Sequence, residues 1–246
     1  MRFSPEKTLT YSILLSLSSL NLTAQSNSSK YEMGINVGTF IYQGDLTPNA
    51  YGSLKTPSFV LGINGSKRLS NAFAIRLDLN IGKLKGDEST YSNPAWRKQR
   101  AFAFKSPVTE IIASAVFHPL GTGRMLSPFL FAGFGYSFLK IRRDYSRYNA
   151  AYFSSESLDA ALNVDIEQSL PKGVPIFPLG IGVRFSLTSR LSLSSEASYR
   201  FMSNDYLDGF SQSGNPDRKD HYYKYAVGFI YSFAGISKYG CPVIKQ

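Results

Sequence analysis

The chain has 246 residues, with 27 Lys or Arg against 17 Asp or Glu and a formal net charge of +10. Its hydrophobic content of 43% is too high for a disordered protein. Charged residues make up only 18% of the chain, while aromatic residues reach 14%. One Cys excludes an internal disulfide framework and a cysteine-based zinc site, and two His leave little material for a histidine metal site. We therefore expect no cofactor.

Residues 1–24 have the features of a secretory signal peptide. Arg2 and Lys7 form a basic segment, residues 9–22 form a short apolar stretch, and Ala24 suits the position before a cleavage site. The alternative, a transmembrane helix, needs about 20 mostly apolar residues, and this stretch is diluted by Ser and Thr. We therefore predict that the mature chain is exported.

After residue 30 the hydrophobic pattern has a period of two. This period is typical of β-strands, because successive side chains point to opposite faces. In the fourth predicted strand Pro107 cannot donate to a ladder, so we expect a bulge there. The eight predicted strands cover residues 31–42, 58–67, 73–82, 102–118, 128–139, 177–187, 191–202 and 221–233.

The links between these strands distinguish a membrane barrel from a soluble sandwich or a lipocalin-like barrel, which would show the same alternation. Short links, such as 188–190, alternate strictly with long links, such as 140–175. Outer-membrane barrels have this order, with short periplasmic turns, longer extracellular loops and an even strand number. We predict an all-β protein. Residues 25–233 form a closed eight-stranded antiparallel transmembrane β-barrel in the cell outer membrane, and residues 234–246 form a short periplasmic tail.

Three stretches carry a family resemblance. Residues 31–48 contain a strand ending in Gly44, Asp45 and Leu46, residues 103–120 contain a strand with a central Glu, and residues 177–211 contain a strand followed by a loop motif. In these stretches the chain resembles the PorG-like family of Bacteroidota outer-membrane β-barrels, which are components of type IX secretion. The resemblance implies a non-enzymatic barrel that anchors or organises periplasmic secretion machinery. The loop motif consists of Asp205, Tyr206, Leu207 and Asp208.

Charged residues occupy the strand face that carries small residues, which is predicted to be the inner face. An eight-stranded barrel is just wide enough for its own side chains to fill the interior. Four acids and four bases balance, which favours a plug of ion pairs, since a selective pore would show rings of one sign. The alternative is a proton or ion path. The eight residues are Glu32, Arg76, Asp78, Glu110, Arg184, Glu196, Arg200 and Lys224.

Basic residues also gather in the predicted periplasmic turns and tail, with no acid in those segments. They either attract inner-leaflet phosphates or dock an acidic face of a partner, such as a secretion-ring protein. Cys241 in the tail is an odd thiol that is either incidental or able to pair with another chain. The predicted docking rim consists of Lys67, Arg68, Arg124, Arg190 and Lys238.

Acidic residues crowd the last long loop. Their oxygens suit Ca²⁺, although their spacing matches no known calcium loop. The alternative is a solvated loop in which Asp205 or Asp208 ties the loop to neighbouring backbone. His221 beside Asp220 could activate water in an enzyme acting on lipid or peptide, whereas a His at a strand end is more often interfacial. The loop acids are Asp205, Asp208, Asp217 and Asp220.

Further basic residues lie in the predicted outer loops. They either face lipopolysaccharide phosphates or form ordinary rim charge. Outer-membrane lipid and lipopolysaccharide are thus expected partners, whereas the location excludes nucleic acid. A generic porin-like or adhesion barrel without a fixed partner remains the main alternative function. The outer basic residues are Arg97, Lys98, Arg100, Lys140, Arg142, Arg143 and Arg147.

Overall fold

The structure is a computed structural model that describes residues 30–48, 53–153, 156–202, 205–215 and 219–233. The predicted signal peptide and the predicted tail, with Lys238 and Cys241, lie outside the described residues, as does Asp217.

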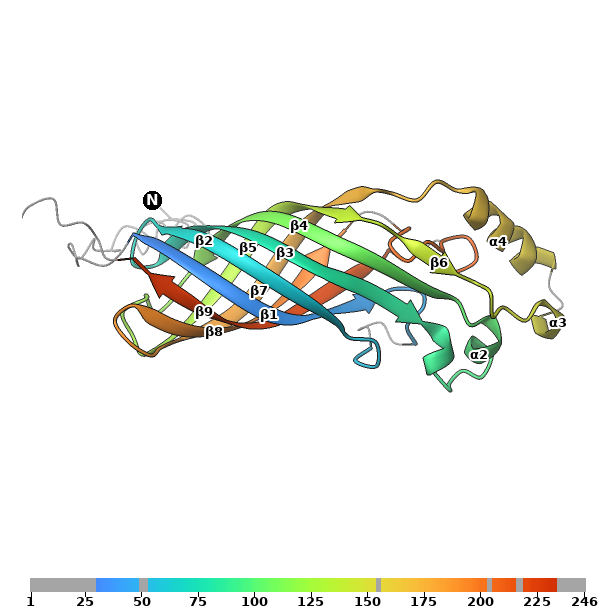
Figure 1. Cartoon of the computed structure of the whole chain (residues 1–246), viewed down its shortest axis with the longest axis horizontal. Helices are drawn as coiled ribbons and strands as arrows, with labels where there is room; N and C mark the ends of the chain where they lie inside the picture. The colour runs from blue at the N-terminus through green and yellow to red at the C-terminus, as the bar shows by residue number, and fades with distance from the viewer. Residues whose placement is uncertain (1–29, 49–52, 154–155, 203–204, 216–218, 234–246) are drawn as a thin grey trace, which may run out of the picture. The chain divides into compact units, whose positions relative to one another are not determined.

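Eight long antiparallel strands form a closed barrel (Figure 1). Each strand pairs with its neighbours along the chain, and the first pairs with the last to close the ring. The predicted fold class and all eight predicted strands are therefore confirmed. The strands are β1 (Tyr31–Gln43), β2 (Ser58–Arg68), β3 (Phe73–Asp87), β4 (Ala103–Phe117), β5 (Leu126–Leu139), β7 (Gly173–Ser186), β8 (Leu191–Phe201) and β9 (His221–Ser232).

A short additional strand, β6 (Arg142–Asp144), continues β5 along the edge of β4. The strand β4 pairs with β5 and then with β6 in one unbroken register, and its register with β3 is also unbroken. The predicted bulge at Pro107 is therefore wrong, since no extra residue is inserted there. Instead Pro107, which has no N–H to donate, lies where the pairing passes from β5 to β6.

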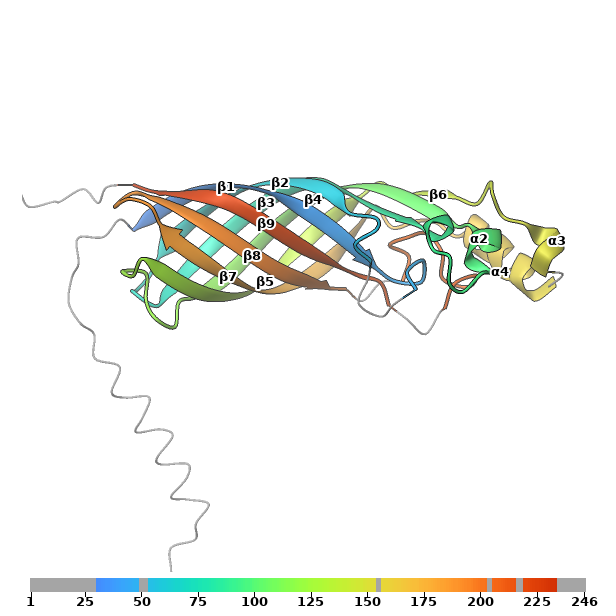
Figure 2. The same cartoon turned by 90° about the horizontal axis from the view of Figure 1, so that it is seen from below.

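The short turns lie at one end of the barrel and the long links at the other (Figures 1 and 2). We call these the turn end and the outer end. The links at the outer end carry η1 (Glu88–Thr90), α2 (Arg97–Arg100), α3 (Ala150–Phe153) and α4 (Glu156–Glu167). Within the described residues, every helix is too short or too polar to cross a membrane.

Apolar side chains cover the outer wall of the barrel. Ile35, Leu77 and Ile181 are each at least 60% exposed, whereas their neighbours along each strand face inward. On β3 the apolar positions extend from Phe73 to Ile81. At about 3.3 Å per residue and a tilt of about 40°, this run spans roughly 20 Å, close to the ~25 Å apolar band of membrane barrels.

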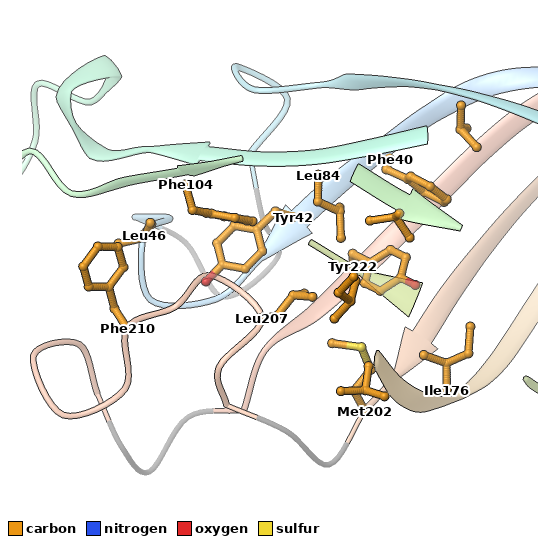
Figure 3. Packing of buried hydrophobic residues seen from close by; sticks show 14 of the residues in the cluster. Phe40, Tyr42, Leu46, Leu84, Phe104, Ile176, Met202, Leu207, Phe210 and Tyr222 are labelled. Atoms are coloured by element: carbon orange, nitrogen blue, oxygen red, sulfur yellow. The ribbon is translucent and has the colours of Figure 1, made fainter. Parts of the chain in front are cut away.

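The largest buried apolar cluster lies inside the outer end of the barrel (Figure 3). There inward-facing strand residues such as Phe40 and Phe104 pack against Leu46, Leu207 and Phe210 from the long links. The rings of Phe102 and Phe210 stack with centroids 4.5 Å apart. We call the packed link segments 44–48, 88–102 and 205–215 the cap, because they cover the inner side chains of the outer end.

Candidate functional site: the barrel interior and its cap

All eight charged residues predicted to face the lumen lie in the barrel interior, and each makes an ion pair with a residue of opposite sign. The alternation of the strands explains this placement, because a charged residue at every second position points to one face. The pairs form three groups, one near the turn end, one in the middle and one below the cap.

The group near the turn end is centred on Glu32. The Arg184 guanidinium lies 2.9 Å from both carboxylate oxygens, and the Ser232 hydroxyl donates to one of them. Arg68 also pairs with Glu32. Its predicted position on the docking rim is wrong, because β2 continues to Arg68 and turns this side chain inward. The interior therefore contains one more base than the eight predicted residues include.

In the middle group Arg76 lies between two acids. Its Nε is 3.0 Å from Asp78 and its Nη1 is 3.0 Å from Glu196. The other oxygen of Glu196 lies 3.2 Å from the Lys224 ammonium. The guanidinium of Arg76 also stacks over the Phe131 ring, 4.3 Å from its centroid. Charges of alternating sign thus cross the lumen from β3 to β9.

The group below the cap is centred on Glu110, which is fully buried. The Arg200 guanidinium lies 3.3 Å from each of its oxygens. The Tyr222 hydroxyl donates to one oxygen, and the Asn80 amide donates to the other at 2.9 Å. Both oxygens therefore have a charged and a neutral partner, which is what a buried carboxylate requires.

A different arrangement holds the cap to the barrel. The Tyr42 hydroxyl lies 2.6 Å from the Asp208 carboxyl and 2.7 Å from the Asp220 carboxyl (the ring of Tyr42 is shown in Figure 3). A phenol has only one proton to donate, so one of the two carboxyls must itself be protonated and donate to the phenol oxygen. Burial raises the pKa of both Asp208 and Asp220 well above the usual aspartate value, and Asp208 raises that of Asp220 further.

The remaining oxygens of this carboxyl pair bind the last long link. One oxygen of Asp220 accepts hydrogen bonds from the Leu207 and Asp208 amides at 3.0 and 3.4 Å, and Asp208 accepts from the Phe210 amide at 2.8 Å. The carboxyl of Asp205 accepts from a serine hydroxyl, and burial raises its pKa to about 6. Asp208 thus ties the loop to neighbouring backbone, as the alternative to a calcium site predicts, but the solvated part of that description is wrong for Asp208, which is fully buried, while Asp205 is partly buried.

Two motifs of the family resemblance meet in this cap. Leu46 and Leu207 belong to one apolar cluster, and Asp45 accepts a hydrogen bond from the Asn215 amide at 2.6 Å. A Cβ added to Gly44 would lie 1.9 Å from both the Asp220 carboxyl and a tyrosine hydroxyl. Glycine is therefore needed at this position, because any side chain would displace the carboxyl pair.

The loop acids and the histidine do not form the sites considered from the sequence. Among the described residues, no three acidic, His or Cys side chains gather into a group that could hold a metal ion. One oxygen of Asp220 binds the Tyr42 hydroxyl of β1, and the other accepts from amides of the cap. His221 packs instead beside Tyr199, with ring centroids 5.2 Å apart, and its Nδ1 accepts from the Met202 amide. The structure therefore does not place the Asp220 carboxyl on His221.

Several outer basic residues are structural. Arg97 and Arg100 both bind the fully buried Glu88 carboxylate, at 2.8 and 2.6 Å. Arg143 donates to the carbonyls of Asp165 and Ile166 at the end of α4. Neither placement could be read from the sequence, because each depends on how the links fold back. Lys98, Lys140, Arg142 and Arg147 are exposed, and Arg147 pairs with Asp87.

The predicted docking rim is reduced by these placements. Lys67, Arg124 and Arg190 are exposed at the turn end, whereas Arg68 is paired in the lumen and Lys238 lies outside the described residues.

The sequence reasoning missed Tyr42, which the alternation of β1 places on the inner face. Extending the inner face of β1 by two residues beyond Phe40 would have found it.

Comparison with known proteins identifies the family of this chain. A family model described as a domain of unknown function (DUF6089) matches residues 7–239. The chain belongs to this family. No curated protein sequence matches the DUF6089 chain.

Similar solved structures are small barrels of low sequence identity. The attachment invasion locus protein Ail of Yersinia pestis is 13% identical, with 84% of this chain and 99% of that chain covered and a TM-score of 0.46. Neisserial surface protein A is 15% identical, with 84% and 99% covered and a TM-score of 0.47. The outer membrane protein OprG of Pseudomonas aeruginosa is 11% identical, with 84% and 97% covered and a TM-score of 0.44.

Proposed function

We propose that this DUF6089 barrel is a non-enzymatic protein of the outer membrane that anchors periplasmic secretion machinery and conducts no ions. The observation that carries the proposal is a barrel with an apolar outer wall and an interior closed by ion pairs. The finer assignment to type IX secretion rests on the family resemblance in the sequence.

The outer wall supports the membrane location. Exposed apolar residues occur on all eight barrel strands, whereas soluble monomers rarely expose contiguous apolar patches larger than a few hundred Å². Aromatic residues flank the apolar wall at both ends, with Phe73 and Phe117 paired at the turn end and Tyr136 and Phe138 at the outer end. Membrane barrels place aromatic girdles at both interfaces and long loops outside the cell, so we assign the outer end to the exterior.

The interior supports a closed barrel. An ion that entered the lumen would have to separate pairs such as Glu110 and Arg200, which are buried and share two oxygens. Separating a buried pair leaves an uncompensated charge, which is strongly unfavourable. The cap above these pairs adds a second obstruction. We therefore expect single-channel recordings of the full chain in planar bilayers to show no stable steps, and a persistent ion-selective conductance would contradict the proposal.

The turn end supports docking. Lys67, near the end of β2, and Arg124 and Arg190, in the short links, are exposed there, so their charge can change without burying an ion. If they bind an acidic periplasmic partner, the triple charge reversal Lys67→Glu, Arg124→Glu and Arg190→Glu should release that partner. Arg68 is left unchanged, because a Glu at position 68 would face the Glu32 carboxylate inside the lumen.

The test is co-purification from native envelope at low and high salt. We expect the reversed variant to fold and reach the membrane but to lose the partner that the wild type retains at 0.1 M salt. Because the Debye length falls from about 10 Å at 0.1 M to about 3 Å at 1 M salt, high salt should also weaken wild-type recovery. A matched control reverses Lys55, Lys98 and Lys219, which are exposed at the outer end. Equal recovery from both variants and the wild type would refute docking through the rim.

A further inference from the structure

Five exposed cations lie in two adjacent rows on the outer wall at the outer end. The strand β3 continues past its apolar positions, and the pairing of β3, β4 and β6 aligns these cations across the sheet. One row contains Lys83 and Lys140 on either side of Pro107, whose carbonyl accepts from the Lys140 amide at 3.2 Å. The next row contains Lys85, Lys105 and Arg142. We call this surface the two-row patch.

The two-row patch faces away from the barrel interior. Leu84, Phe104 and Ser106, which alternate with these cations along β3 and β4, are buried inside. Neighbouring strands lie about 4.8 Å apart, and positions two residues apart on one strand are separated by about 6.6 Å. The five cations therefore occupy an area of about 10 Å by 7 Å at the level of the backbone.

The charges in this patch repel one another. Lys85 lies directly opposite Lys105, and Lys105 lies directly opposite Arg142. Like charges directly opposite each other destabilise a sheet. Within the described part of the chain, none of the five makes an ion pair. Asp87 pairs with Arg147, and Asp144 accepts from Ser146 and attracts Lys105 only over a longer distance than an ion pair. The sheet thus contains a repulsion that an anion from outside the chain would relieve.

The position of the patch indicates the source of that anion. Along β3 the patch begins two residues after Ile81, the last of the apolar positions, and along β5 two residues after Phe138. A surface that begins where the apolar wall ends lies at the level of the lipid headgroups. The same strands that contact acyl chains would therefore bring the cations against the charged groups of the same lipids.

We propose that the two-row patch binds the phosphates of a phosphorylated glycolipid in the outer leaflet. This inference rests on the proposed outer-membrane location and adds a lipid partner to it. Lysines attract phosphate as point charges, and Arg142 can donate two parallel hydrogen bonds to one phosphate. Two rows separated by about 6.6 Å suit a headgroup that carries more than one phosphate. Lipid bound there would cover the most strongly repelling part of the sheet.

The first experiment measures binding of bis-phosphorylated lipid A to the full chain in neutral detergent by native mass spectrometry. We expect the triple variant Lys85→Gln, Lys105→Gln and Arg142→Gln to bind on the order of a hundredfold more weakly, since each cation near an anionic surface contributes about 1 kcal/mol and about 1.4 kcal/mol is a factor of ten in affinity. The control triple Lys55→Gln, Lys98→Gln and Lys219→Gln removes the same charge from the same end and should bind like the wild type. Unchanged binding by the patch variant, or an equal loss in both variants, would overturn the inference.

Two further measurements accompany this experiment. Competition with other ligands identifies the chemical group that is bound, and thermal unfolding keeps the inference testable if a variant is less stable. Inorganic phosphate at millimolar concentration should not displace lipid A, and a phosphate-free glycolipid should not bind; either opposite result would overturn the assignment to a lipid phosphate. In lipid-free neutral detergent, Lys105→Gln should raise the unfolding temperature because it removes the central repelling charge, whereas Lys98→Gln should not. Added lipid A should then stabilise the wild type more than Lys105→Gln.

The experiments distinguish a refuted lipid site from a refuted proposed function. Loss of lipid A binding affects neither membrane fractionation nor the expected absence of conductance. A chain that fractionates with the outer membrane but binds lipid A equally with and without the patch would refute only the lipid site. A chain that does not reach the outer membrane would refute the proposed function itself.

Discussion

The barrel interior and the junction between cap and barrel both bury carboxylates, but they neutralise them in different ways. In the interior each predicted acid faces an Arg or Lys, as Glu110 faces Arg200. At the junction of cap and barrel, Asp208 and Asp220 face one phenol, and the described residues contain no ion pair of either. The interior is therefore neutralised by opposite charge and the junction by a retained proton.

This difference predicts different sensitivities. Removing one partner of an interior ion pair destabilises the folded barrel, because the remaining charge stays buried. Losing the proton at the junction destabilises the cap, because two carboxylates then share one hydroxyl. Mutations and pH should therefore separate the two regions.

The largest effect is expected in the interior. Arg200→Ala leaves Glu110 buried without its charged partner and should destabilise the folded barrel by roughly 3–5 kcal/mol. Urea unfolding in detergent, followed by circular dichroism, would measure the loss. The exposed control Lys98→Ala should leave the midpoint unchanged. The double variant Arg200→Met with Glu110→Gln should recover part of the stability, and a single variant as stable as the wild type would contradict the ion-pair description.

The next effect concerns pH at the junction. The folded pKa of Asp208 and of Asp220 lies above the ordinary value of 3.8. Their shared proton therefore stabilises the cap fully below that value, and this stability is lost as pH rises through the folded pKa. Asp205, whose pKa is raised from 3.8 to about 6, adds the same dependence over that interval. Hydrogen exchange of the amides of residues 207–210, corrected for intrinsic rates, should therefore show weaker protection at pH 8 than at pH 5.

The matched variant is Asp208→Asn, which can hydrogen-bond to the phenol without titrating. It should reduce the pH dependence of protection and stabilise the cap at pH 8 by on the order of 1–2 kcal/mol relative to the wild type. The exposed control Glu167→Gln should retain the wild-type dependence. Equal protection of the wild-type amides at both pH values would show that no proton is shared at the junction.

A smaller effect is expected where the long link after β5 meets the cap. Arg143 donates to carbonyls at the end of α4 and to the Gly209 carbonyl. A cation at a helix C-terminus contributes about 0.3–1 kcal/mol, so Arg143→Ala should speed hydrogen exchange in α4 by a few fold. Arg142→Ala, on the opposite face of β6, serves as the control. Identical exchange in both variants would show that Arg143 does not stabilise α4.

The smallest effect is expected for an exposed pair. Arg147 and Asp87 lie 3.0 Å apart, but their side chains are 45% and 33% exposed. Solvent-exposed pairs contribute about 0–1 kcal/mol, so Arg147→Ala should change the urea midpoint far less than Arg200→Ala. If Arg147→Ala lowered the urea midpoint as much as Arg200→Ala, burial would not determine how much these ion pairs contribute to stability.

The alternation of residues was sufficient to predict the strands and most of the interior. A strand side chain points inward or outward by its parity, so Glu32, Arg76 and Arg200 could be assigned to one face before their partners were known. Errors arose at strand ends. The period of two predicts an end at residue 67 for β2 and at residue 82 for β3, whereas these strands continue to Arg68 and Asp87, so Arg68 lies in a strand and not in the predicted turn. Periodicity weakens where apolar residues give way to charged ones, as at Lys83 and Lys85.

The sequence by itself determined that this chain forms an eight-stranded barrel with charges on its inner face, because the strands and their two faces follow from a local period of two and the barrel follows from the strict order of short and long links. Only the tertiary structure decided which charges meet and how the outer end is covered. Tyr42 and Asp208 are 166 positions apart in the chain, and Arg97 and Arg100 reach Glu88 only because the link folds back. Such contacts depend on how loops pack, and loop packing has no periodic signature in the sequence.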